Sequence, residues 1–134
     1  MQPPPDTLAF GTAAHGCAMT LLHNAAYIQK ELPRIHLPDP LRADVQRLCE
    51  TWVGIKHDLI GALGDLAATL RETVPDPAAI DRHCGVIRSM LDEILEPTDR
   101  VVHALSDAAG RDPSCFLANL LVMESAANVI GAIP

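Results

Sequence analysis

The sequence predicts an all-α protein, an up-down-up-down four-helix bundle that forms a single domain over residues 1–134. Two observations support this prediction. Apolar residues recur every three or four positions along most of the chain, which is the spacing of one face of an α-helix. Three Asp-Pro pairs separate these periodic segments, and Asp followed by Pro is a typical helix start.

The Asp-Pro pairs place the starts of the last three helices. Asp39, Asp76 and Asp112 can each accept hydrogen bonds from the free N–H groups of a first turn, where the following proline needs no donor. Short connections make consecutive helices antiparallel neighbours. We expect helices at 7–32, 40–73, 77–109 and 113–132, after a short Pro-rich arm at 1–6.

One proline falls inside a predicted helix. Pro97 lies within the segment 77–109, where it removes one backbone hydrogen bond and clashes with the preceding turn. The third helix is therefore expected to be kinked or broken near Pro97.

Composition bears on the classes of partner. The chain has 10 Lys and Arg against 17 Asp and Glu, a net charge of -7, which repels phosphate backbones and anionic lipids. The most apolar segment is interrupted by Asn119, Glu124 and Asn128, which a bilayer-spanning helix seldom contains. The N-terminus does not resemble a secretory signal. We expect a cytoplasmic protein with reduced cysteines that binds neither nucleic acid nor membranes.

Side chains that bind soft metals occur at two places on the predicted helices. Cys17, His83 and Cys84 fall near one end of the predicted bundle, and His15 lies one helical turn from Met19. These side chains could hold zinc or copper with a ligand from elsewhere. Cysteine at a stripe position more often packs as a small apolar side chain, so no cofactor is predicted and metal or cofactor binding is the alternative function.

A buried ion pair is predicted between Lys56 and Glu124. Both fall at similar heights on the second and fourth helices, and a buried ammonium needs a partner. The alternative is a lysine whose stem covers apolar surface while its amine reaches water. An acid-base enzyme built on this pair ranks last, because no helix-bundle catalytic or cofactor motif accompanies it. The protein is therefore expected not to be an enzyme.

The fourth helix is apolar on two opposite faces when projected at about 100° per residue. One face contains Phe116, Leu120, Met123, Ala127 and Ile130. The opposite face contains Cys115, Val122, Val129 and Ile133. We predict that this second face is an interaction surface, most simply in a symmetric homodimer, so the main functional hypothesis is protein-protein interaction. The alternative is a central helix covered by its own neighbours.

Overall fold

The computed structural model describes residues 5–133, which contain four long α-helices, two short 3-10 helices and no strand. The predicted all-α four-helix fold is confirmed. In chain order the elements are α1 (Pro5–Glu31), η1 (Leu32–Arg34), α2 (Asp39–Leu70), α3 (Pro77–Arg111), η2 (Pro113–Cys115) and α4 (Phe116–Ala132). Helix α1 begins two residues before the expected start, and the rest of the predicted arm, 1–4, lies outside the described residues.

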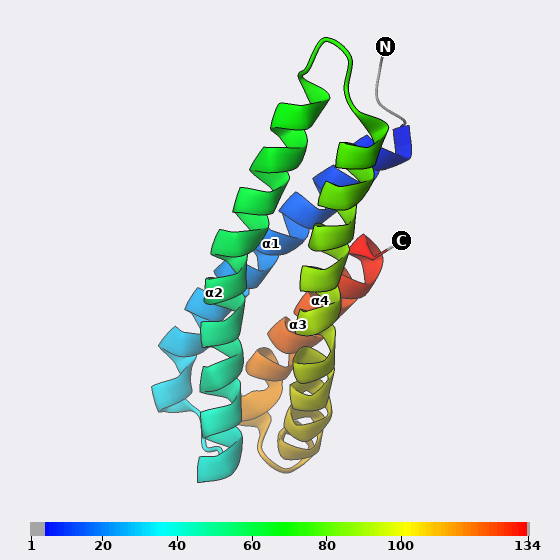
Figure 1. Cartoon of the computed structure of the whole chain (residues 1–134). Coiled ribbons are helices and arrows are strands. Elements are labelled where there is room, and N and C mark those ends of the chain that lie inside the picture. Colours follow the sequence, from blue (N-terminus) through cyan, green and yellow to red (C-terminus); the bar gives the residue numbers. More distant parts are fainter. Residues whose placement is uncertain (1–4, 134) are drawn as a thin grey trace.

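The four helices form a ring in which each has two neighbours. Helix α1 packs against α2 and α4, and α3 packs against the same two helices, so α1 and α3 are diagonal, as are α2 and α4. Helices α2 and α3 make a long hairpin that α1 and α4 cross at an angle (Figure 1). Helix α4 has 17 residues, whereas α3 has 35. The end of the hairpin where α2 and α3 are connected therefore extends beyond α4.

The core is built from the apolar stripes of all four helices. Its largest completely buried side chains include Trp52, Leu21, Ile28, Leu59, Ile87, Leu91, Ile94 and Leu105. Near the middle of the hairpin, the Trp52 indole nitrogen donates a 3.1 Å hydrogen bond to the Thr98 hydroxyl. The apolar residues that recur every three or four positions along the first three helices, such as Leu21, Ile28, Leu59, Ile87 and Leu91, therefore face inward.

One of the three Asp-Pro pairs caps its α-helix as predicted, and a second caps the 3-10 helix η2 instead. Asp76 accepts a 3.1 Å hydrogen bond from the Ala78 amide, and Asp112 accepts a 3.0 Å bond from the Ser114 amide. Asp39 makes no such bond, because α2 already begins at this residue. After Asp112 a 3-10 turn intervenes, so α4 starts at Phe116 rather than at residue 113.

The predicted break near Pro97 does not occur. Helix α3 continues without interruption from Pro77 to Arg111. Ile94, Thr98 and Val101 are buried on either side of the proline, and we attribute the continuous helix to this packing, which outweighs the one lost hydrogen bond. A kink in a continuous helix stays a prediction.

Candidate functional site

The structure does not gather the predicted metal ligands into one group. Within residues 5–133, no group of three or more His, Cys, Asp and Glu side chains could hold a metal ion. Cys17 and Cys84 are buried on diagonal helices, whereas His15 and Met19 are exposed on α1, and His83 is half-buried. Burial raises the pKa of Cys17 to about 11 and also raises the pKa of Cys84, which disfavours the thiolate that binds metals.

The predicted pair between Lys56 and Glu124 is wrong. Their helices, α2 and α4, are diagonal in the ring, so equal height along the bundle does not bring the two side chains together. Lys56 is half-buried, and the exposed Glu124 accepts a 3.2 Å hydrogen bond from the Asn24 amide nitrogen instead. Among residues 5–133 neither side chain forms an ion pair.

The predicted interaction surface on α4 is also wrong, because the helix is turned the other way. Cys115, Val122 and Val129 are completely buried, and Ile133 is half-buried. The residues outside are the large ones: Phe116 is 57% exposed, Leu117 42%, Leu120 42%, Met123 45% and Ile130 56%. We attribute this orientation to size, since the inward face of α4 consists mainly of Ala and Val side chains that let the helix approach its neighbours closely.

The outward surface of α1 resembles that of α4 in lacking charge. Residues 7–29 contain no Asp, Glu, Lys or Arg, and residues 116–133 contain one, Glu124. By contrast, α2 carries eight such residues and α3 carries ten. Because α1 and α4 are neighbours, one side of the molecule is almost uncharged. We call this surface the α1–α4 face and define it by seven exposed apolar side chains, Met19, Tyr27, Phe116, Leu117, Leu120, Met123 and Ile130. Leu8 of α1 is also exposed, but it lines a separate recess against α2.

A groove lined by small side chains runs between α1 and α4. Its lining includes Ala13, Gly16 and Thr20 on α1, and Ala127 and Gly131 on α4. A Cβ atom added to Gly16 or Gly131 would meet no other heavy atom within 4 Å, so the groove is open at both glycines. The α1–α4 side of the molecule thus combines protruding large side chains with a recess.

A buried polar cluster joins α1 to α4. The Asn24 side chain is 1% exposed, and its amide nitrogen lies 2.9 Å from the Ser125 hydroxyl and 3.2 Å from the Leu121 carbonyl. Ser125 also donates to the Leu121 carbonyl, at 2.9 Å. In the described part of the chain, Asn24 Oδ1 is the one buried side-chain N or O atom without a hydrogen-bond partner. The sequence reasoning missed this cluster; an Asn within the apolar pattern of α1 was its only signal.

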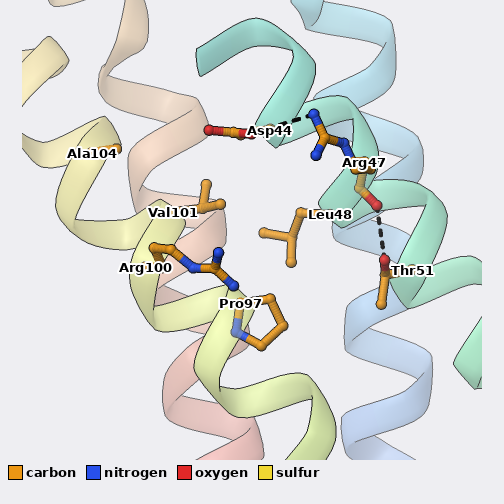
Figure 2. Close-up of a pocket in the computed structure, with 8 residues that line it drawn as sticks. All are labelled: Asp44, Arg47, Leu48, Thr51, Pro97, Arg100, Val101 and Ala104. Atoms are coloured by element: carbon orange, nitrogen blue, oxygen red, sulfur yellow. Dashed lines mark hydrogen bonds and ion pairs between the residues drawn. The ribbon is translucent and has the colours of Figure 1, made fainter. Parts of the chain in front are cut away.

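The hairpin of α2 and α3 contains a separate small pocket. Arg47 and Arg100 line it above an apolar floor of Leu48, Pro97 and Val101, and its volume is about 150 Å³ (Figure 2). Each arginine pairs with a carboxylate on its own helix, Arg47 with Asp44 at 3.5 Å and Arg100 with Glu96 at 3.8 Å. The lining also includes Thr51, whose hydroxyl donates a 2.9 Å hydrogen bond to the Arg47 carbonyl, and it contains no imidazole.

Helix α4 is also unusual in its hydropathy. By length and composition the segment Pro113–Ala132 could cross a membrane, with a mean hydropathy of 1.5. However, 44% of this apolar stretch is buried inside the bundle, and the core helix of a bundle can meet the same criteria of length and composition. The Asn119 side chain accepts a 3.2 Å hydrogen bond from Ser106 on α3. These contacts favour α4 as part of a packed bundle with one apolar outer surface.

The α1–α4 face is therefore the feature of the described chain that most needs a functional explanation. The metal candidates are dispersed, the predicted ion pair is absent and the hairpin pocket is small. Comparison with protein families, with curated proteins and with solved structures finds no match to this chain.

Proposed function

We propose that this protein is a non-enzymatic interaction module that binds another protein surface through its α1–α4 face. The observation that carries the proposal is that the exposed apolar side chains of the α1–α4 face have almost no charge among them. Charged side chains such as Arg47, Glu50 and Asp92 occupy the exposed surface of α2 and α3. The α1–α4 face exposes large apolar side chains with one charged residue among them, which is the composition of an interface core.

The size of the face supports the same proposal. Its seven apolar side chains together expose on the order of 500 Å² of surface, near the upper limit for the largest apolar patch of a typical monomer. Phe, Tyr and Met, which protein interfaces favour, contribute four of these seven side chains. A partner that covers this patch gains roughly 25 cal/mol of favourable free energy for each Å² of apolar surface that it removes from water.

The chemistry of the partner follows from the charge of the chain. A net charge of -7 disfavours nucleic acid and anionic membranes, so we keep a protein as the partner and a cytoplasmic location as an expectation. Metal or cofactor binding remains the alternative. We rank it lower because Cys17, His83 and Cys84 offer no assembled ligand set.

Site-specific photocrosslinking in cells tests this proposal. A photoreactive amino acid placed at Leu120 should capture a protein, whereas the same group at the exposed Glu50 of α2 should not. Capture from Leu120 should be lost when Met123→Glu introduces a charge on the same face. Equal capture from both positions, or capture from Leu120 that Met123→Glu leaves unchanged, would show that the face is not a docking surface.

A further inference from the structure

We infer that the α1–α4 face binds the same face of a second copy of this chain, about a twofold axis. This inference rests on the proposed function and specifies the partner. It differs from the dimer expected from the sequence in its residues, because Val122 and Val129 are buried within one chain. The contact instead uses the large exposed side chains of α4 together with the groove between α1 and α4.

The first argument concerns charge. An apolar face gains most from a partner face that is also nearly uncharged, because burying unpaired charges against it is costly. Among the described helices, α1 and α4 are the two that present such a surface, whereas α2 and α3 carry eighteen charged residues between them. A head-to-tail contact would place the apolar face against those charges. A twofold contact places it against itself.

The second argument concerns size. Helix α4 has 17 residues and is about 25 Å long, and two adjacent helices are roughly 20 Å wide. Their footprint is on the order of 500 Å², and the accessible area of a side-chain surface exceeds its footprint. The area therefore approaches the ~800 Å² per partner of a standard protein interface. The two helices at their observed lengths are therefore large enough for such an interface.

The third argument concerns shape. A twofold interface must be self-complementary, so one face has to carry both protrusions and recesses. Phe116, Leu120 and Met123 protrude from α4, and the groove lined by Gly16 and Gly131 lies toward the C-terminal end of the same helix. Large side chains of one copy can enter the groove of the other, in the manner of ridges packing into grooves. The open space at both glycines is thereby filled.

Glu124 is the one charged side chain on the α4 part of the contact. Its desolvation opposes association, whereas Glu124→Gln removes the charge and keeps a carbonyl acceptor for the Asn24 amide. This conservative change should therefore tighten the dimer, by on the order of tenfold in Kd. A surface that stays in water would show no such gain.

Sedimentation equilibrium of the purified full chain at micromolar concentration tests the inference. The native protein should have twice the 14.4 kDa mass of one chain. Leu120→Glu and Gly131→Leu should each raise the dimer Kd at least tenfold, the first by placing a charge in the contact and the second by filling the groove. Gly54→Leu on α2 is the matched control, because Gly54 is equally open but lies away from the face.

The outcomes separate this inference from the proposed function. Circular dichroism and Trp52 fluorescence establish that each variant is folded, and Glu124→Gln provides a test that does not depend on a disruptive change. A native monomer at 100 µM, or a dimer that none of these variants affects, would overturn the inference. If the chain is monomeric while Leu120 captures a different protein in cells, self-association fails and the proposed function stands.

Discussion

Trp52 on α2 and Thr98 on α3 are joined by a hydrogen bond inside the core of the bundle. The indole nitrogen donates to the threonine hydroxyl at 3.1 Å, and both side chains are completely buried. The hydroxyl in turn donates to the Ile94 carbonyl at 2.8 Å. The two long helices of the hairpin are thus connected by a polar contact one residue beyond Pro97, within an otherwise apolar layer.

Replacing Thr98 by Val should lower the free energy of unfolding by about 1–3 kcal/mol. The substitution preserves the shape of the side chain but leaves the buried indole N–H without its acceptor. Urea unfolding followed by fluorescence measures the effect, because Trp52 is the single tryptophan of the chain. Thr98→Ser keeps the hydroxyl and is the control, with a smaller loss from one missing methyl group. Equal stability of Thr98→Val and the native protein would mean that the indole finds another acceptor.

Gly54 and Gly64 should both be replaceable by Ala with a gain in stability. Their position within α2 suggests either close helix packing or a bound cofactor, but a Cβ added at either position meets no other heavy atom within 4 Å. Close packing is therefore not the reason for these glycines. Each substitution should raise the free energy of unfolding by roughly 0.5–1 kcal/mol, because Ala loses less backbone entropy in a helix.

The reverse change at an exposed helical alanine provides the control for the glycine substitutions. Ala26→Gly on α1 should lower the free energy of unfolding by a similar amount. Thermal or urea unfolding of the three variants measures all these effects. If Gly54→Ala or Gly64→Ala destabilises the protein, the position has a role that the contacts of the isolated chain do not explain.

The sequence predicts the buried residues of α2 and α3 well because those helices are polar on their other side. Leu48, Trp52 and Leu59 of α2, for example, are buried as their spacing predicts. Helix α4 lacks this contrast, since apolar side chains surround it. Side-chain size, which periodicity does not measure, accounts for the choice between its two faces: Val122 and Val129 go inward, and the larger Phe116 stays outside.

Contacts between helices are harder to predict from the sequence than the helices themselves. Position along a helix gives the height of a residue in the bundle, but it does not give which helices are neighbours. Lys56 and Glu124 have similar heights and lie on diagonal helices, so the predicted pair fails. Asn24 and Ser125 lie on adjacent helices and do meet. Only the ring arrangement of the four helices distinguishes these two cases.

The cysteine thiols should react slowly with a thiol reagent in the native protein at pH 8. All four cysteines are free and buried. Burial raises the pKa of Cys17 to about 11, and burial together with the nearby Glu50 charge raises that of Cys49 to about 12, so little reactive thiolate is present. Labelling should become fast in urea. Rapid native labelling of all four thiols would contradict the packing of the core.

The same pKa shifts predict a loss of stability at alkaline pH. A thiol pKa that is higher in the folded state than its ordinary value of 9.0 stabilises the fold fully below pH 9, and this contribution falls as pH rises toward 11 or 12. The free energy of unfolding should decrease by up to ~1.4 kcal/mol per pH unit for each such thiol. Urea unfolding between pH 8 and about 11 measures the slope. Cys17→Ala/Cys49→Ala should have a shallower slope, and an unchanged slope would assign the loss to other groups.

Pro97→Ala should stabilise the protein, because the native helix tolerates the proline only at a cost. Pro97 has no N–H to donate to the carbonyl four residues earlier, and a proline in a helix interior is unfavourable by about 3 kcal/mol relative to Ala. The ring is half-buried and lines the hairpin pocket beside Leu48 and Val101, so some packing is lost in exchange. We expect a net gain of roughly 1–2 kcal/mol in the free energy of unfolding. Pro97→Gly also restores the N–H. Its free energy of unfolding should lie between those of the native protein and of Pro97→Ala, since Gly is about 1 kcal/mol less favourable than Ala in a helix. Hydrogen exchange should show stronger protection near residue 97 in the Ala variant. If the native protein is more stable than both variants, packing of the ring between α2 and α3 outweighs the missing hydrogen bond.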